Sequence, residues 1–164
     1  MTTQLQEIAN EIGAILKQRE ETIAIAESSS GGLISASLLS VPGASTYFTG
    51  GSVVYTANAR KLYLDIDLKK HTGIRSSTEQ YAALLAKASR KKLQATWGLA
   101  ETGAAGPTRN SYGDAPGHTC IAISGESINF ETTVETRDTN REINMYSFAE
   151  IALENLRNIL KEVQ

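Results

Sequence analysis

TIAIAESSSGG, residues Thr22–Gly32, is the most informative stretch of this 164-residue chain. Its first half is a short apolar run typical of a buried strand, and its second half is a turn of serines and glycines. Apolar residues at helical spacing follow over 33–39. A strand, a small-residue turn and a helix in this order place backbone N–H groups at the carboxyl edge of a sheet. The stretch therefore predicts an α/β fold with a turn suited to an anionic small molecule.

A second turn of this kind occurs at 101–107, ETGAAGP, after the apolar run 96–100. The small residues of 102–107 let a ligand approach the backbone N–H groups closely. A strand-ending turn without a ligand is the alternative. The polar segment 108–118 that follows is long for a loop, and loops of this length are often functional. Its candidate side chains are Arg109, Tyr112, Asp114 and His118.

Periodicity outward from these turns predicts alternating helices and strands, ending in a hairpin. The helices are expected over 4–18, 33–39, 58–64, 78–93 and 140–163, and the strands over 22–27, 51–55, 96–101, 118–124 and 128–135. Ser30 is expected to cap the second helix. We predict one domain over 1–164, a three-layer α/β/α sandwich around a mixed, mostly parallel sheet with a late antiparallel hairpin.

Composition narrows the classes of function. The net charge of −2 gives no basic surplus for nucleic acid, and no apolar run approaches the length of a membrane span. The polar start of the chain does not have the layout of a signal peptide, so we expect a soluble cytoplasmic protein. The single cysteine, Cys120, lies in an apolar strand and is expected to be an inert core residue. The two histidines and the single cysteine show none of the usual metal-ligand spacings, so neither a metal nor another cofactor is expected.

The serines at 28–30 allow two interpretations. They can cap a helix and fix the turn, or one can act as a nucleophile while the others bind phosphate. A serine nucleophile needs a nearby base, and His71, His118 and Lys61 are the candidates.

Tyr55, Arg60 and Lys61 form the second group. They can be a strand end and a solvated helix face, or they can line a pocket. Adjacent helical residues point about 100° apart, so Arg60 and Lys61 cannot face one pocket equally. A buried lysine can lose its proton and act as a base, whereas an arginine retains its proton.

Four motifs give the chain a resemblance to a known family. They are AESxSGG at 26–32, VPGASxYFxGG at 41–51, VVY at 53–55 and TGxAGP at 102–107. In order and spacing they resemble the CinA C-terminal domain family of competence/damage-inducible proteins, in which the first motif usually reads AESCTGG. The resemblance runs nearly end to end. It implies a metal-independent serine amidohydrolase that converts nicotinamide mononucleotide (NMN) to nicotinate mononucleotide and ammonia.

The resemblance also implies roles for residues at matching positions. Ser28 matches the serine of the first motif and is the expected nucleophile, with Ser45 as the less favoured candidate. Tyr55, at the position of the family's tyrosine, and Lys61, one position after that of the family's lysine, are the expected proton carriers. Thr102 and Arg141 are assigned to the phosphate or sugar of the substrate. The other residues assigned to substrate binding are Ser30, Gly31, Gly32, Arg60, Gly103, Ala105 and Gly106.

The chain departs from the family pattern at several positions. The family's Cys-Thr is Ser29-Ser30, its glycine-rich loop after the proline is the polar segment 109–114, and its Gly-Asp-Arg is TNR over 139–141. The family's Tyr-Ser-Asn-Glu-Ala-Lys is YTANAR over 55–60, so Arg60 stands where a lysine is usual. Two functions are therefore kept: amidohydrolysis of NMN or another amide, and nucleotide binding by a module that has lost catalysis. Members of the family commonly self-associate, and a homodimer is expected by analogy.

Overall fold

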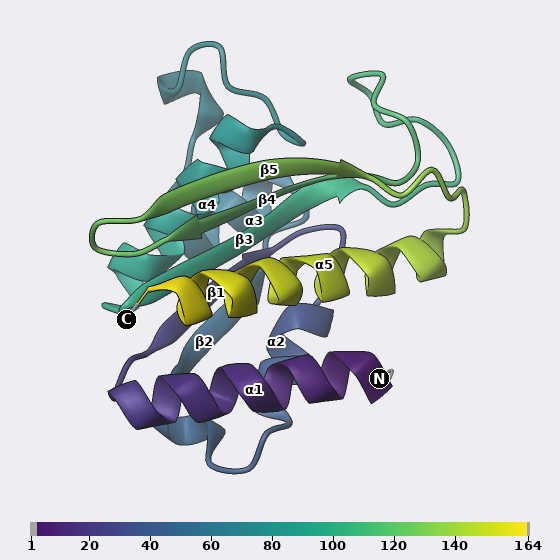
Figure 1. The fold of residues 1–164 in the computed structure, drawn as a ribbon. Helices are drawn as coiled ribbons and strands as arrows, with labels where there is room; N and C mark the ends of the chain where they lie inside the picture. The colour runs from purple at the N-terminus through teal and green to yellow at the C-terminus, as the bar shows by residue number, and fades with distance from the viewer. Residues whose placement is uncertain (1–2, 164) are drawn as a thin grey trace.

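The computed structural model describes residues 3–163, which form a five-stranded sheet in the order β2-β1-β3-β4-β5 (Figure 1). β1 pairs in parallel with β2 and β3, while β4 pairs antiparallel with β3 and β5. The strands are β1 (Ile23–Glu27), β2 (Phe48–Val53), β3 (Trp97–Ala104), β4 (His118–Ser124) and β5 (Asn129–Glu135). The helices are α1 (Thr3–Arg19), α2 (Leu33–Leu39), α3 (Ala57–Leu64), α4 (Glu79–Lys92) and α5 (Arg141–Glu162), with short 3-10 turns at Ala44–Thr46 and Leu68–Lys70.

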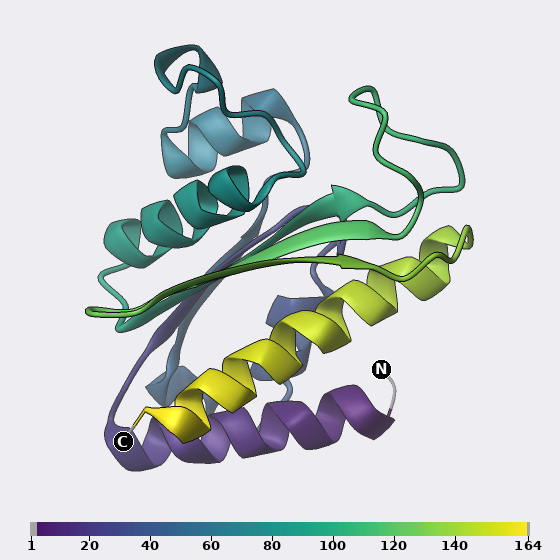
Figure 2. The same ribbon diagram turned by 45° about the horizontal axis from the view of Figure 1, so that its top comes forward.

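Helices cover both faces of the sheet, as Figure 2 shows. α1, α2 and α5 lie on one side, and α3 and α4 lie on the other. The expected three-layer α/β fold with a mostly parallel core and an antiparallel end is confirmed. No helix within 3–163 is both long enough and apolar enough to cross a membrane.

The two faces of the sheet carry side chains of different size. Those packed toward α1, α2 and α5 are large: Ile23, Ile25, Trp97, Leu99, Ile121 and Ile123. Those packed toward α4 are small: Ala26, Ala100, Cys120 and Ala122. The small residues let α4 approach the sheet closely, and a Cβ on Gly98 would collide with the carbonyl oxygen of Ala86. Cys120 is buried, as expected, and burial raises the pKa of its thiol to about 11.

Two details differ from the sequence expectations. The second strand begins at Phe48 rather than at 51, because Phe48 is already paired with Ile23 of β1. Ser30 does not cap α2: the cap residue is Gly32, and no side chain of the cap position accepts a hydrogen bond. The carboxylate of Glu27 performs this role instead, accepting the N–H groups of Ile34 (3.1 Å) and Ser35 (3.0 Å).

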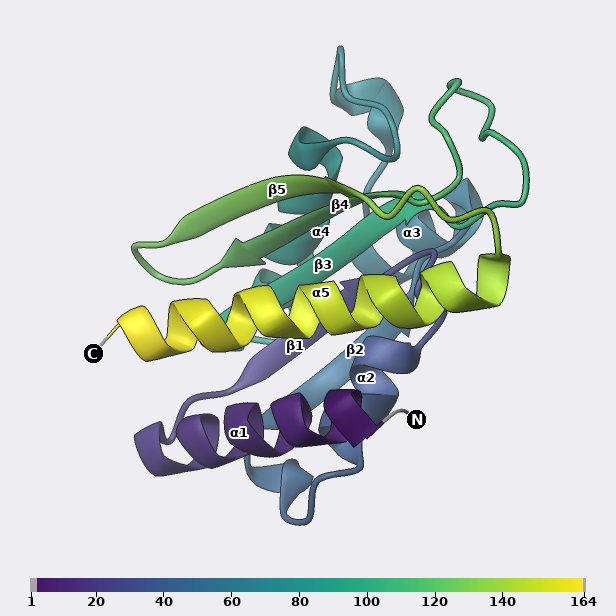
Figure 3. The ribbon, with the colours of Figure 1, turned by 45° about the vertical axis from the view of Figure 1, so that its right-hand side comes forward.

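The topology brings the two glycine-bearing turns to one edge of the sheet. The turn after β1 and the loop after β3 both leave the carboxyl ends of neighbouring parallel strands. Figure 3 shows the first turn of α5 beside the loop that joins β3 to β4. This edge of the sheet is where open α/β sheets bind their ligands.

Candidate functional site

A cavity of about 330 Å³ opens at this edge of the sheet. It is lined by Ser28, Tyr55, Ala57, Arg60, Ser76, Ser77, Tyr81, Thr102, Gly103, Asn110, Ser111 and Tyr112. Most of these side chains carry a hydroxyl group, and Arg60 is the one ionised side chain among them at neutral pH. The lining therefore offers hydrogen bonds and a single positive charge, which suits a polar, anionic ligand.

The turn that carries Ser28 is built around a buried carboxylate from β3. One oxygen of Glu101 accepts the backbone N–H groups of Ser28 (3.1 Å) and Ser30 (2.8 Å). The other oxygen accepts the hydroxyls of Ser29 and Thr119. Burial raises the pKa of Glu101, and these hydrogen bonds act in the opposite direction. Glu101 thus fixes the backbone of the turn and leaves the partly exposed Ser28 at the cavity wall.

Ser30 lies behind the cavity rather than in its wall. Its hydroxyl is fully buried and lies 2.8 Å from a carboxylate oxygen of Glu27 and 2.9 Å from one of Glu101. Ser30 thus bridges the two acidic side chains, and its single hydroxyl proton is shared between their carboxylate oxygens. This role is structural, because all of its contacts lie within the protein.

Arg60 reaches the cavity from α3. Its Nη1 atom makes only long contacts of 3.4 Å, one to the Ser76 hydroxyl and one to the Tyr81 hydroxyl. Its Nε atom is buried and has no hydrogen-bond partner among residues 3–163. The guanidinium carbon lies 5.6 Å from the centre of the Tyr81 ring. Arg60 is therefore held against an aromatic ring with much of its hydrogen-bonding capacity unused.

Tyr55 forms the rim of the cavity on the side of α5. Arg141, the first residue of α5, donates one hydrogen bond to the carbonyl of Gly106 (2.8 Å) and another to the Tyr55 hydroxyl (3.2 Å). Arg141 therefore connects the start of α5 to the loop after β3 and to the segment that follows β2. Because the phenol oxygen accepts this bond, the phenol proton is available to a group in the cavity.

Ser77 occupies a backbone conformation that is uncommon for a residue other than glycine. Its φ is 60°, and it is 4% exposed. Its N–H donates to the Thr102 hydroxyl (3.3 Å), its carbonyl contacts Nε2 of His118 (2.9 Å), and its hydroxyl accepts from Asn110 (3.3 Å). Three contacts from separate segments hold this residue against the cavity.

The loop between β3 and β4 is fastened over the cavity by an ion pair. Arg75 binds both carboxylate oxygens of Asp114, at 2.7 and 2.9 Å, and this pairing lowers the pKa of Asp114. Asn110 also donates to Asp114 (2.8 Å), and the Tyr112 ring centre lies 5.1 Å from the Arg75 guanidinium carbon. The loop residues 110–112 become one wall of the cavity as a result.

His118 ties the start of α4 to the hairpin. Its Nδ1 lies 2.5 Å from a carboxylate oxygen of Glu135, and its Nε2 lies 2.9 Å from the carbonyl of Ser77. Burial disfavours the charged imidazole, but the Glu135 carboxylate and the Ser77 carbonyl outweigh burial and raise the pKa of His118. With an acceptor at each ring nitrogen, the protonated ring is the form that satisfies both contacts.

A pH dependence of stability follows from this geometry. Since the pKa of His118 is higher in the folded state than its unfolded value of about 6.5, its stabilising contribution is complete below that value and is lost as pH rises through the folded pKa. Urea unfolding of the wild type across this pH range should show the loss. The variant Glu135→Gln should show a smaller fall, and equal falls in both proteins would contradict the assignment to His118.

The structure brings several of the predicted site residues together and separates others. Ser28, Tyr55, Arg60, Thr102 and Gly103 share the cavity wall. Gly31 and Gly32 shape the turn behind it, with φ of 67° and 102°, conformations that favour glycine. Ala105 and Gly106 contribute backbone carbonyls that accept hydrogen bonds from Asn144 and Arg141.

Lys61 and Ser45 lie away from the cavity wall. Lys61 is exposed on α3, and its charge acts on the nearby carboxylate of Asp67. Ser45 is exposed in the short turn before β2, whereas Ser28 follows β1. Because β1 and β2 are parallel, these two serines lie at opposite ends of the sheet. The catalytic roles expected for Lys61 and Ser45 remain predictions.

Sequence reasoning missed part of the lining, namely Ser76, Ser77, Tyr81, Asn110 and Ser111. Tyr81 was hidden in the apolar stripe of a helix. Ser76 and Ser77 lie in a stretch without helical or strand periodicity, directly before that helix. Of the two cap candidates that the sequence offers, Ser77 and Thr78, the structure shows Thr78, whose hydroxyl accepts from the N–H of Tyr81. For Ser76 and Ser77, the one available signal was that two adjacent serines stand directly before a helix start.

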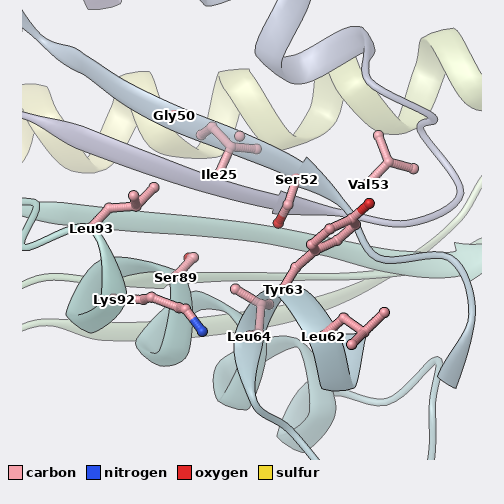
Figure 4. A pocket seen from close by; sticks show the side chains of 11 residues that line it. Ile25, Gly50, Ser52, Val53, Leu62, Tyr63, Leu64, Ser89, Lys92 and Leu93 are labelled. Carbon is pink, nitrogen blue, oxygen red and sulfur yellow. The ribbon is translucent and has the colours of Figure 1, made fainter. Parts of the chain in front are cut away.

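A larger cavity, of about 710 Å³, lies elsewhere, between β2 and the helices α3 and α4 (Figure 4). Its wall is mainly apolar, including Val53, Leu62, Leu64 and Leu93. None of the serines of the 28–30 turn and no residue of the loop after β3 reaches it. The smaller hydroxyl-lined cavity is therefore the candidate site for chemistry.

Comparisons with known proteins agree on one family. The family model described as the CinA C-terminal domain matches residues 5–160. A CinA-like protein of Prochlorococcus marinus is 35% identical over 148 residues, covering 88% of this chain and 35% of that protein. A CinA-like protein of Picosynechococcus is 37% identical over 156 residues, covering 92% of this chain and 36% of that protein. The chain thus spans about a third of the length of these curated relatives.

Solved structures share the fold over nearly the whole chain. A competence/damage inducible protein of Agrobacterium tumefaciens superposes with a TM-score of 0.89 at 25% identity, covering 98% of each chain. A competence damage-inducible protein of Klebsiella pneumoniae gives a TM-score of 0.90 at 19% identity, covering 98% of this chain and 99% of that one.

Proposed function

The chain belongs to the CinA C-terminal domain family, and from this membership and the cavity described above we propose that it is an amidohydrolase acting on NMN. The products are nicotinate mononucleotide and ammonia, and the reaction uses a serine without a metal. The observation that carries the proposal is the presence of Ser28 and Thr102, from two separate glycine-bearing turns, in the wall of one hydroxyl-rich cavity.

The proposed chemistry begins at Ser28. Its Oγ attacks the carboxamide carbon, and its proton passes to a nearby acceptor and then to the departing ammonia. Water then attacks the acyl-enzyme ester, releases the acid and returns the proton to Ser28. Donors must stabilise the oxyanion of each tetrahedral intermediate. The N–H of Gly31 is not free for this, since it donates to the Ser28 carbonyl (3.1 Å).

Tyr55 is the better placed of the two expected proton carriers. It lines the cavity, whereas Lys61 does not. Tyr55 can relay the proton in one concerted step, in which the phenol gives its own proton to the leaving amine as its oxygen takes up the Ser28 proton. The hydrogen bond from Arg141 (3.2 Å) holds the phenol oxygen in place for this transfer.

Tyr55→Phe should therefore lower kcat by about 10²–10⁴-fold, the usual effect of losing a general acid–base, with little change in KM. Steady-state ammonia release with NMN measures both constants. Lys61→Gln, tested in parallel, should retain most of the activity. A loss confined to Lys61→Gln would transfer the proton-carrying role to that lysine.

A second function is favoured by one specific observation. The cavity wall contains Arg60 and no lysine, histidine or carboxylate, so a permanently charged group stands where the family usually has a lysine. A nucleotide-binding module without turnover fits that wall. Purified protein incubated with NMN separates the two functions, because release of ammonia and nicotinate mononucleotide supports hydrolysis, whereas calorimetric binding without either product supports the module.

We also propose that the protein forms a homodimer. β2 is an edge strand of the sheet and carries no charged residue, and Leu62 and Tyr63 are exposed beside it. Light scattering at micromolar concentration should give twice the mass of one chain. The variant Leu62→Lys should shift this mass toward the monomer, and a monomeric wild type would refute the proposal.

A further inference from the structure

We infer that Arg60 is the receptor for an oxyanion of the ligand, a carboxylate or a phosphate, and that the cavity selects ligands carrying such a group. The inference rests on the proposed function only in taking this cavity as the ligand site. It goes further by naming the ligand group that the cavity demands and the residue that binds it.

The charge of Arg60 is not neutralised by the protein. Arg60 makes no ion pair within the described residues 3–163, in contrast to Arg75, which is paired with Asp114. The two carboxylates nearest the Ser28 turn, Glu27 and Glu101, are occupied by backbone N–H groups and serine hydroxyls. The cavity therefore carries a positive charge that a ligand has to balance.

Much of the hydrogen-bonding capacity of Arg60 is also unused. Nε is buried without a partner, and the two contacts of Nη1 are at the 3.4 Å limit of a hydrogen bond. Burying the Nε–H group without an acceptor costs free energy that a bound anion recovers. An Arg60 stacked beside Tyr81 is thus prepared for an acceptor that the protein itself does not supply.

The chemistry of the guanidinium defines that acceptor. Its planar fork of N–H groups matches two oxygens of a carboxylate or phosphate, which a neutral carboxamide cannot provide. The hydroxyls of Ser28, Ser76 and Thr102 in the same wall can donate further hydrogen bonds to such a group. A pyridine nucleotide offers both possibilities, because its phosphate is always an oxyanion and its ring substituent becomes one when the amide is hydrolysed.

The test is calorimetric titration of the folded protein with inorganic phosphate, nicotinate and nicotinamide as separate probes. The wild type should bind at least one of the two anions, more weakly as salt concentration rises, because screening reduces the attraction. Arg60→Gln should reduce this affinity at least tenfold, and Arg60→Lys should lie between, since a lysine keeps the charge without the fork. Lys69→Gln, which removes one charge from an exposed residue outside the cavity, is the matched control and should bind like the wild type.

The probes distinguish the source of the oxyanion. Phosphate binding that depends on Arg60 identifies a phosphate receptor. Nicotinate bound at least tenfold more tightly than nicotinamide, with the difference abolished in Arg60→Gln, identifies a carboxylate receptor. The inference is overturned if neither anion binds the wild type at millimolar concentration, or if Arg60→Gln and Lys69→Gln bind alike.

The inference and the proposed function fail in different experiments. Binding of an anion through Arg60 without ammonia release from NMN would refute hydrolysis and leave the receptor intact. Ammonia release that is unchanged in Arg60→Gln, with no binding of either anion, would refute the receptor and leave hydrolysis intact. If circular dichroism shows that Arg60→Gln does not fold, two measurements still test the inference. Anion affinity should fall in Arg60→Lys, and it should fall in the wild type as salt concentration rises; if neither changes, Arg60 is not the receptor.

Discussion

Ser28→Ala should abolish ammonia release from NMN, with kcat reduced by roughly 10³-fold or more, because it removes the oxygen proposed to form the acyl-enzyme. The substitution removes one oxygen atom that faces the cavity. The backbone N–H of Ser28, which binds Glu101, remains in place, so the turn should keep its shape. Binding of NMN to the variant should be retained, which calorimetry can verify.

Ser45→Ala provides the matched comparison, since it removes the same atom from the other candidate serine. Ser45 is exposed before β2, at the opposite end of the sheet from Ser28. The variant should therefore release ammonia at nearly the wild-type rate. The reverse result, an active Ser28→Ala and an inactive Ser45→Ala, would move the nucleophile to Ser45 and require that turn to reach the active cavity of another subunit.

Much of this cavity could be predicted from local sequence. The turns at 28–32 and 102–107 each follow a buried strand, and parallel pairing of β1 with β3 brings both to one edge. That is why Ser28 and Thr102 could be placed together without a structure. The hairpin of β4 and β5 was equally visible, because its two strands are adjacent in sequence around Gly125.

The residues that could not be predicted are those whose roles depend on contacts between distant segments. Ser77 lies in an irregular segment, and only its contacts with Thr102, Asn110 and His118 bring it to the cavity wall. Arg60 and Lys61 were equivalent in sequence, and only the orientation of α3 shows that Arg60 faces the cavity. Helical periodicity gives the angle between two neighbours but not which one points inward.

Glu101 is the clearest case of such a residue, and its replacement should have the largest effect on stability. In the sequence Glu101 is only one charged residue that interrupts an apolar run. In the structure it is fully buried and accepts hydrogen bonds from the 28–30 turn and from Thr119. Glu101→Ala leaves two backbone N–H groups without an acceptor, at about 1–3 kcal/mol for each buried group. We expect a loss of about 3 kcal/mol or more in the free energy of unfolding, measured in urea.

Glu101→Gln should cost much less, and the reason lies in the partners of each oxygen. The N–H groups of Ser28 and Ser30 both donate to one oxygen of Glu101, and the amide carbonyl of glutamine can accept them in its place. The other oxygen contacts only the hydroxyls of Ser29 and Thr119, and hydroxyls can rotate to accept from an amide NH₂. The expected loss is about 1 kcal/mol. Equal losses in Glu101→Ala and Glu101→Gln would show that the negative charge, rather than the acceptor geometry, holds the Ser28 turn.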